Sequence, residues 1–286
     1  MVPNPSRNYM SLYYNNIRGM TGKKDHIVRS TSTCDYDLIV LSETWLNNSK
    51  FSAEFFDPSY IVYRKDRDNT DVIANKAGGV LIAIDSKYDS EIVDVPEHEH
   101  LEAICIRVHL GSTNSKMYVY GLYIQCGANE EVYLSHLRAI LSAHSMIAHG
   151  DIFTVIGDFN MPTVQWSANE DGFDFLPLIG NSESRQSAIA RTMTSSLLDC
   201  GLFQMSDIQN ESQNVLDLFY TNVPELFVVN PADLLLIPPS CQDVAHVQTQ
   251  CMIECEPAVY VPSSASEQIY CFKKAPFATI RQELSR

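Results

Sequence analysis

The sequence predicts an α/β fold in which two mixed β-sheets pack face to face and helices cover the outside. Short apolar runs separated by turn residues recur along most of the chain, which is typical of many short strands. Few segments show helical periodicity, and strands and helices do not alternate regularly, which disfavours an all-parallel sheet. No internal repeat or linker is evident before about residue 256, so we expect one domain followed by a Pro/Ser-rich tail.

The expected strands follow one another from the N-terminus almost to the tail. The run DLIVLS at 37–42 is apolar throughout, as expected for a strand buried on both faces. The run at 101–110 alternates instead, with Ile104, Ile106 and Val108 on one side and Cys105 and Arg107 on the other. The other expected strands are 9–14, 60–63, 79–84, 117–124, 152–156, 214–220, 233–237 and 247–255.

Three helices are expected between these strands. The clearest lies at 130–149, where apolar residues recur at spacings of three and four. A second is expected at 186–200, where Gly201 would end it, and a short one at 23–32.

The charge of the chain limits how it can bind nucleic acid. Its 286 residues carry 20 Lys and Arg against 35 Asp and Glu, a formal net charge of −15. This argues against binding through a large positive surface, but not against an enzyme with a small site and a metal ion. Residues 139–272 contain only Arg185 and Arg191 as cations, so a phosphate-binding surface should draw on the first half of the chain.

The sequence also indicates a compartment. Eight cysteines without a C-x-x-C pair are too few for a disulfide scaffold and favour free thiols in a reducing environment. No secretory signal is evident, and no apolar run approaches the roughly 20 residues of a membrane span. We therefore expect an intracellular protein without a membrane partner.

Two polar residues follow early strands and are candidates for a site. Asn16 follows the strand YMSLYY, and taken alone it could equally be a turn residue. Glu43 closes the apolar run LIVLS, where a carboxylate is costly unless it is exposed, pairs or binds a cation.

The most specific signal is IGDFN, directly after the apolar run IFTVI. Asp158 and Asn160 lie two apart, so in an extended chain their side chains point to the same side. An acceptor beside a neutral donor can hold and polarise a water next to a phosphate.

Three further candidates lie late in the chain. Asp217, within the apolar run VLDLFY, needs a partner, and a histidine proton is a suitable one. Such an Asp could orient His246 and stabilise its protonated form, which could then stabilise a phosphoryl oxygen or protonate a leaving group. Asp243 lies three residues before His246 and could be a metal ligand, a group that supports a ligand, or a turn residue.

Taken in order, these motifs resemble the exonuclease–endonuclease–phosphatase superfamily. More closely, the chain resembles the apurinic-like endonuclease domain of non-LTR retrotransposons. The resemblance covers about residues 9–256 and a tail segment at 270–284. The segments that carry it are YYNNIRGM (13–20), DLIVLSETWL (37–46), KAGGVLIAI (76–84), VYGLYI (119–124), TVIGDFNMP (154–162), GLFQ (201–204), NVLDLFYTN (214–222) and DVAH (243–246).

The resemblance implies a four-layer, DNase-I-like sandwich and a role for each candidate. Glu43, helped by Asn16, would bind a divalent cation, Mg²⁺ or Mn²⁺, with Asp243 as a further possible ligand. Tyr123 would lean on the scissile phosphate. The remaining residues, Asp158, Asn160, Asp217 and His246, would activate the water and stabilise the developing charge. The reaction would be hydrolysis of a DNA phosphodiester that leaves a 3′-hydroxyl.

The family pattern usually has adjacent Asp and His residues, whereas Asp243 and His246 are separated by two residues here. The relative placement of these two side chains should therefore differ from the usual one, and His246 is the stronger candidate.

The resemblance also implies partners and a domain boundary. The partner would be double-stranded DNA in the nucleus, contacted through a rim of basic residues in turns after early strands: Arg18, Lys23, Lys24, Arg64, Lys65 and Arg67. Residues 1–256 would form the endonuclease domain. Residues 257–286 would be a linker that leads to a reverse transcriptase in the parent element, which these 286 residues do not include.

Two other functions stay open at this point. The chain could be another hydrolase of the superfamily, such as an abasic-site repair enzyme, a deadenylase, or a phosphatase acting on inositol phosphates or sphingolipid. It could also be a catalytically silent domain, which the altered Asp243–His246 spacing would suit.

Overall fold

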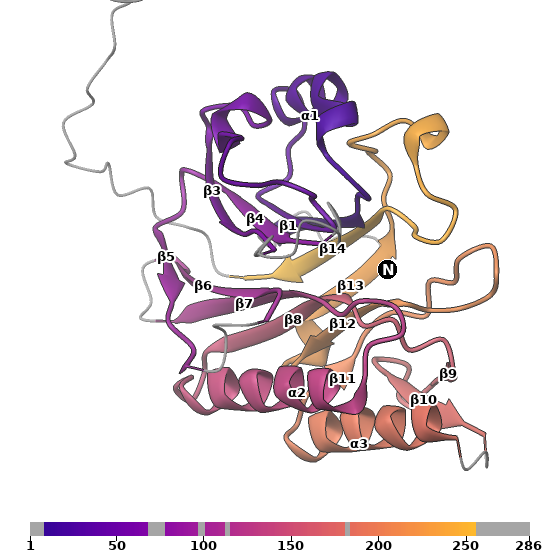
Figure 1. Cartoon of the computed structure of the whole chain (residues 1–286). Helices are drawn as coiled ribbons and strands as arrows, with labels where there is room; N and C mark the ends of the chain where they lie inside the picture. Colours follow the sequence, from indigo (N-terminus) through magenta and orange to yellow (C-terminus); the bar gives the residue numbers. More distant parts are fainter. Residues whose placement is uncertain (1–8, 68–77, 97–100, 112–114, 181–183, 256–286) are drawn as a thin grey trace, which may run out of the picture.

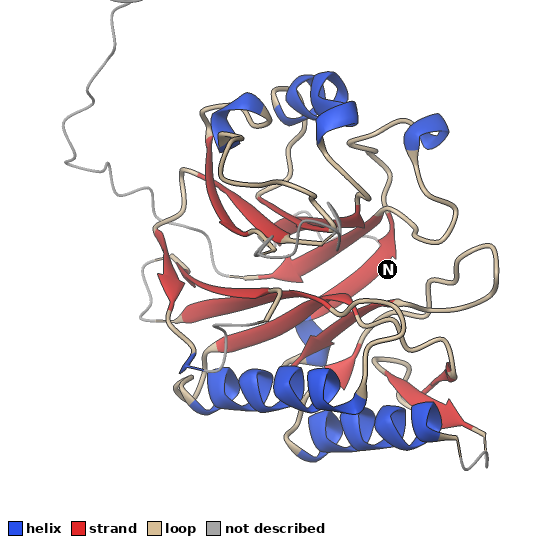
Figure 2. Ribbon diagram, in the orientation of Figure 1, coloured by secondary structure: helices blue, strands red, loops and turns tan. Residues whose placement is uncertain are grey.

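Two β-sheets stacked face to face form the centre of the molecule in the computed structural model, which describes residues 9–67, 78–96, 101–111, 115–180 and 184–255. Helix α1 covers the outer face of one sheet, and α2 and α3 cover the outer face of the other (Figures 1 and 2). The layers run helix, sheet, sheet, helix, so the predicted four-layer α/β sandwich is confirmed. The predicted tail, 257–286, lies outside the described residues.

The smaller sheet has six strands in the order β13-β14-β1-β2-β4-β3. Strands β1 and β2 are parallel, and the other neighbours are antiparallel. Its strands are β1 (Tyr9–Asn16), β2 (Leu38–Ser42), β3 (Tyr60–Lys65), β4 (Val80–Asp85), β13 (Phe227–Pro231) and β14 (Thr249–Glu254).

The larger sheet has eight strands in the order β5-β6-β7-β8-β12-β11-β10-β9. Strands β7 and β8 form its one parallel pair among the described strands. Its strands are β5 (Ser90–Val93), β6 (Ala103–His109), β7 (Lys116–Tyr123), β8 (Ile152–Asp158), β9 (Val164–Ala168), β10 (Phe175–Ile179), β11 (Phe203–Gln204) and β12 (Asp217–Thr221).

Side-chain caps mark the start of two of the three α-helices in the described residues. Helix α1 spans Lys24–Thr31. Helix α2 spans Glu130–Ser145, and the Asn129 side chain caps it by accepting a hydrogen bond from the Val132 N–H. Helix α3 spans Arg185–Asp199 and is capped in the same way by Ser184. No helix among the described residues is both long enough and apolar enough to cross a membrane.

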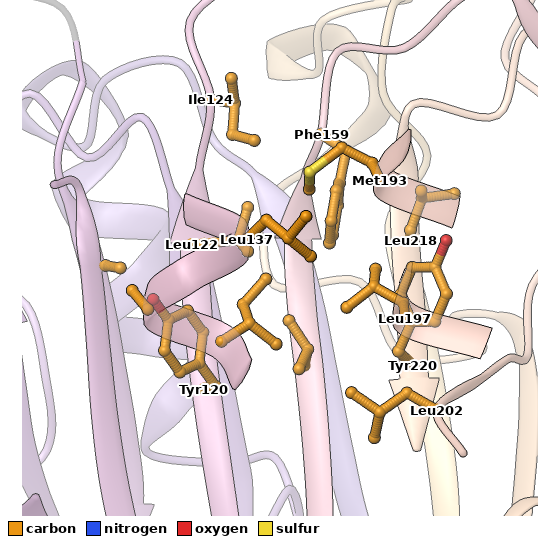
Figure 3. Packing of buried hydrophobic residues seen from close by; sticks show 14 of the residues in the cluster. Tyr120, Leu122, Ile124, Leu137, Phe159, Met193, Leu197, Leu202, Leu218 and Tyr220 are labelled. Atoms are coloured by element: carbon orange, nitrogen blue, oxygen red, sulfur yellow. The ribbon is translucent and has the colours of Figure 1, made fainter. Parts of the chain in front are cut away.

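Strand alternation divides the core into separate layers. In β6, Ile104, Ile106 and Val108 pack between the two sheets, whereas Cys105 faces the helices α2 and α3. Figure 3 shows the layer under these helices, where Leu137 and Met193 meet side chains of the sheet. A third apolar cluster lies between the smaller sheet and α1.

One predicted strand is wrong. Residues 233–237 form a loop whose Leu236 and Ile237 are buried in the cluster below α1. The side chain of Gln248 accepts a hydrogen bond from the Ile237 N–H (3.3 Å) and donates one to its carbonyl (2.9 Å). This apolar run is buried without a strand partner, because the Gln248 side-chain amide supplies the hydrogen bonds that the backbone of Ile237 needs.

Five strands were not predicted: β5, β9, β10, β11 and β13. Strand β11 has only two residues, and β9 and β5 lie at the two ends of the larger sheet. Their alternating or mixed exposure gives only a weak apolar pattern.

Candidate functional site

The predicted site residues gather at one end of the sandwich, where strands of both sheets end. Asn16 is the last residue of β1, Tyr123 of β7 and Asp158 of β8. Glu43 follows β2 directly. Strand β12 runs antiparallel to β8, so its first residue, Asp217, lies opposite Asp158. Strand register places these side chains at the ends of their own sheets, and the stacking of the two sheets brings them together.

Asn16 bridges the two sheets. Its side-chain amide donates to Glu43 Oε1 (3.1 Å) and to Asp158 Oδ2 (3.0 Å). Its carbonyl oxygen accepts a hydrogen bond from the Arg18 N–H (3.2 Å), so the NH₂ group is directed at the two carboxylates. Asn16 therefore fixes the relative position of Glu43 and Asp158.

Glu43 lies in a turn with left-handed backbone, at φ 52°. The backbone carbonyl of Glu43 accepts a hydrogen bond from the Gly19 N–H (2.8 Å), which links the turn to the segment after β1. Its Oε2 accepts a hydrogen bond from the Trp45 indole (3.2 Å). A non-glycine residue at positive φ is uncommon and is often found at functional sites. The strained turn aims the carboxylate into the site.

Tyr123 lies beside this carboxylate. Burial, together with the charge and the hydrogen bond of Glu43 and the charge of Asp158, raises the pKa of Tyr123 well above its usual range. The phenol thus remains protonated over the whole neutral range and can act as a hydrogen-bond donor.

Asp158 and Asn160 form a local unit. Asn160, at φ 48°, donates its backbone N–H to Asp158 Oδ1 (2.9 Å) and its side-chain amide to Asp158 Oδ2 (2.8 Å). Complete burial, with a contribution from the charge of Asp217, raises the pKa of Asp158 to about 8. This carboxylate is consequently a stronger base than an exposed one.

Asp217 and His246 form a hydrogen-bonded pair. His246 Nδ1 lies 3.0 Å and 3.2 Å from the two carboxylate oxygens of Asp217. Burial disfavours the charged imidazole and by itself lowers the pKa of His246. The charge and the hydrogen bond of Asp217 outweigh this effect, with help from the charges of Asp158 and Glu43. Together they raise the pKa of His246 to about 9. Asp217 Oδ1 also accepts a hydrogen bond from the Tyr14 hydroxyl (2.9 Å).

The other ring nitrogen of His246 faces Asp158, with Nε2 3.7 Å from Oδ2. The ligand atoms of Asp158, Asp217 and His246 all lie within 4.8 Å of one another, a spacing that a metal ion could also use. A cation there would have to replace a proton on an imidazole whose pKa is raised to about 9. Without a metal ion, this trio therefore carries a proton on the imidazole at neutral pH.

Glu43 is the better metal ligand. Mg²⁺ and Mn²⁺ prefer oxygen donors, and Mg²⁺ is usually held by one or two carboxylates with substrate oxygens completing the shell. Glu43 Oε1 accepts a hydrogen bond from Asn16, Oε2 accepts one from Trp45, and the Tyr123 hydroxyl is a third partner. A carboxylate has about four lone-pair sites, so one remains for a cation. Asn16, whose amide NH₂ faces Glu43, orients this ligand in the observed arrangement. The donor set fits a hard divalent cation.

Asp243 lies outside this arrangement. Its Oδ2 forms an ion pair with Arg18, and its Oδ1 accepts the Ala245 N–H (2.8 Å). The two residues between Asp243 and His246 form a turn in which the His246 N–H donates to the Asp243 carbonyl (3.2 Å). This turn lets His246 reach Asp217 while the Asp243 carboxylate points to Arg18.

The basic residues predicted to form a DNA rim have internal partners. Lys65 is the last residue of β3. The others are paired as follows: Arg18 with Asp243, Lys23 with the Ile17 and Arg18 carbonyls, Lys24 with Glu54 (3.2 Å), Arg64 with Asp66 (3.0 Å) and Arg67 with Glu102 (2.7 Å). Their charges are partly offset within the protein, and contact with DNA stays a prediction.

Sequence reasoning missed several residues at the site. Tyr14 appears only as an apolar strand residue, although a buried tyrosine hydroxyl needs a partner, which was an available signal. Glu102 binds Arg67 (2.7 Å) and the Gly79 N–H (2.9 Å), and the Arg67 guanidinium lies 5.9 Å from the centre of the Tyr123 ring. No local pattern links Glu102 to this cluster.

Comparison with known proteins shows what this fold is similar to. No family model and no curated protein matches the sequence. Among solved structures, the endonuclease domain of TRAS1, a telomere-specific non-LTR retrotransposon, aligns with a TM-score of 0.57 at 13% identity, covering 87% of this chain and all of that domain.

Two further structures align over a similar length. The AP endonuclease LMAP from Leishmania major gives a TM-score of 0.59 at 13% identity over 88% of this chain and 89% of its own. The human Nocturnin catalytic domain, solved with a bound sulfate anion, gives 0.55 at 16% identity over 89% of this chain and all of its own. The predicted fold is therefore confirmed: this chain has the same α/β-sandwich fold as these proteins.

Proposed function

We propose that this chain is a metal-dependent endonuclease that hydrolyses DNA phosphodiester bonds and leaves a 3′-hydroxyl, as the target-nicking domain of a non-LTR retrotransposon. One observation carries the proposal: Asn16, Glu43, Asp158, Asn160, Asp217 and His246 converge at one end of the sandwich in a hydrogen-bonded array. The structural likeness to the TRAS1 endonuclease domain supports the retrotransposon role.

The water-activating group would be Asp158 with Asn160. The amide of Asn160 holds the Asp158 carboxylate, whose raised pKa makes it a suitable base. Asp158 would take one proton from the attacking water while the water oxygen bonds to phosphorus. The bond from phosphorus to the 3′ oxygen then breaks, and that oxygen takes up a proton from solvent water. The products are a 5′-phosphate and a 3′-hydroxyl.

The charge that grows in this reaction needs stabilisation from fixed groups. His246, protonated and oriented by Asp217, would stabilise a phosphoryl oxygen, and the Tyr123 phenol would donate to the scissile phosphate. A divalent cation held by Glu43 would, when bound, offset negative charge on the phosphate oxygens. Asn16 would keep Glu43 in position for that ligand role.

The same proposal assigns the partners. The substrate would be double-stranded DNA in the nucleus, and the parent element would supply a reverse transcriptase that extends the 3′-hydroxyl. Tyr123, Asp158 and His246 offer a donor, a base and a cation to one phosphate, which suits a phosphodiester better than an uncharged ester.

The test is nicking of supercoiled plasmid by the full chain in Mg²⁺ or Mn²⁺, with EDTA as a metal control. We expect nicking by the wild type and at least a hundredfold slower nicking by Glu43→Ala and His246→Ala, since losing a positioned acid or charge-stabilising group costs roughly that factor or more. Glu131→Ala and His109→Ala are matched controls, because both side chains are well exposed and their ion-pair partners, Arg138 for Glu131 and Asp89 and Glu91 for His109, are not site residues.

Three outcomes separate the competing functions. Nicked product that a DNA polymerase extends without prior phosphatase treatment supports the 3′-hydroxyl. Metal-dependent release of phosphate from small phosphomonoesters without nicking would favour another hydrolase of this fold. If neither plasmid DNA nor phosphomonoesters are turned over faster than by Glu43→Ala, the domain is catalytically silent.

A further inference from the structure

A groove lies next to the turn that carries Glu43, because Trp45, two residues further along the chain, lines it. It has a volume of about 670 Å³ and is built from the turn after β1, the segment after β2 and Cys241. Arg18, Lys23 and Lys50 line it together with Trp45. Three cations around an aromatic ring are notable in a chain of net charge −15.

Trp45 is held in an unusual conformation. Its backbone lies at φ 55°, where a bulky residue is rare and strained, and its N–H donates to the Gly78 carbonyl (2.9 Å). The indole N–H donates to Glu43 Oε2 (3.2 Å), which fixes the ring next to the proposed metal ligand. The side chain nevertheless remains 38% exposed.

The backbone of Gly19 covers part of this ring. A Cβ at Gly19, which has φ +91°, would lie only 2.7 Å from a carbon of the six-membered ring of Trp45. The chain therefore supports the indole through Gly19, while the rest of the ring lines the groove. A rigid, supported aromatic surface is the kind of platform on which nucleobases stack.

The charges around the groove suit a polyanion. Lys23 is held by the carbonyls of Ile17 and Arg18, which keeps its ammonium group at the groove wall. Arg18 is paired with Asp243, but its side chain is 56% exposed and can exchange this partner for a phosphate. No carboxylate is among the described residues that line the groove; Asp243 and Glu43 reach it only through their contacts with Arg18 and Trp45.

We propose that this groove binds the nucleotides that flank the scissile phosphate and that a base stacks on Trp45. The proposal rests on the proposed function and extends it to the choice of substrate. A base inside a regular duplex is stacked on both faces and cannot also stack on the indole. The groove should therefore select DNA in which a base is already unpaired or easily unstacked.

Equilibrium binding tests this directly. The background is the His246→Ala chain in EDTA, so neither cleavage nor metal loading contributes. The probes are two short fluorescein-labelled duplexes that differ only in one bulged base, and fluorescence anisotropy gives their Kd values. Trp45→Ala should weaken binding of the bulged duplex about tenfold, the value of one lost stacking contact, and should affect the regular duplex less.

Two variants separate stacking from other effects. Trp45→Phe loses the hydrogen bond to Glu43 but keeps an aromatic ring, so it should retain most of the affinity. Phe51→Ala removes a side chain that is 72% exposed and does not line the groove, so it should bind as the background does. Thermal denaturation of each variant shows whether it is folded.

Equal Kd values for the background and Trp45→Ala on the bulged duplex would overturn the subsite, and so would the absence of binding by the background. Plasmid nicking by the wild type, together with binding of the bulged duplex that does not depend on Trp45, would overturn the subsite and leave the endonuclease activity standing. Trp45-dependent binding of the bulged duplex without plasmid nicking would support the stacking subsite and overturn the proposed endonuclease activity.

Discussion

Asp217 should control the protonation of His246, and the Asp217→Asn variant tests this. The substitution removes one negative charge and keeps the shape of the side chain. The amide oxygen can still accept a hydrogen bond from the Tyr14 hydroxyl. Without that charge, burial should dominate and lower the pKa of His246 towards or below its ordinary value of 6.5.

The expected size follows from the pKa of His246, which is raised from 6.5 to about 9. At about 1.4 kcal/mol for each unit, the shift corresponds to about 3 kcal/mol of folding free energy. Because the pKa is raised, this stabilisation is fully present below the unfolded value of 6.5 and is lost as the pH rises through about 9. Glu43 also attracts the imidazolium, whereas Asp158, with its pKa raised to about 8, is largely neutral at mildly acidic pH. We therefore expect Asp217→Asn to lose about 2 kcal/mol there.

Urea unfolding of both proteins in EDTA, at mildly acidic pH and above pH 9, measures this difference. The variant should be clearly less stable at the lower pH. At the higher pH it should be at least as stable as the wild type, because the imidazole is neutral there and the repulsion between Asp217 and Asp158 is removed. An NMR titration of the imidazole should show the lowered pKa directly. A destabilisation of the same size at both pH values, or an imidazole that still titrates near pH 9, would refute the reasoning.

Two further predictions concern the supporting structure. Tyr14→Phe removes the hydroxyl that binds Asp217 and should cost about 1 kcal/mol, a fall of about 3 °C in Tm, whereas Tyr220→Phe should cost nothing because its buried hydroxyl has no hydrogen-bond partner among the described residues. Equal Tm changes in the two variants would contradict this. Gly157→Ala would place a Cβ 2.1 Å from a backbone oxygen of β7 and should destabilise by about 1–3 kcal/mol or more, whereas at Gly121 the nearest atom is a side-chain methyl at 3.1 Å. Urea unfolding compares the two, and a Gly157→Ala protein as stable as Gly121→Ala would show that the strands can separate there.

Much of the fold could be predicted because burial leaves a local pattern. The run at 37–42 is apolar throughout, since β2 is central in its sheet and packs on both faces. The alternation at 101–110 marked β6 for the opposite reason, because its two faces meet different layers. The run at 233–237 misled the prediction because apolar residues also pack beneath loops, and nothing local shows that Gln248 satisfies their backbone.

The site was predictable where its chemistry is local. Asp158 and Asn160 hold each other within one turn, so their spacing alone indicated a unit. The contact of Asp217 with His246 was inferred from chemical need, since a buried carboxylate requires a partner. The choice between ligand and turn residue for Asp243 could not be made, because its partner Arg18 lies far away in the sequence.

The sequence by itself determined which residue types stand at the ends of the apolar runs and hence which side chains could act. Only the tertiary structure decided their partners. Asn16 reaches Asp158 because the two sheets stack, and Asp217 lies opposite Asp158 because β12 pairs with β8 in one register. These contacts join residues far apart in the chain, and their geometry depends on strand register and sheet packing, which no single local pattern specifies.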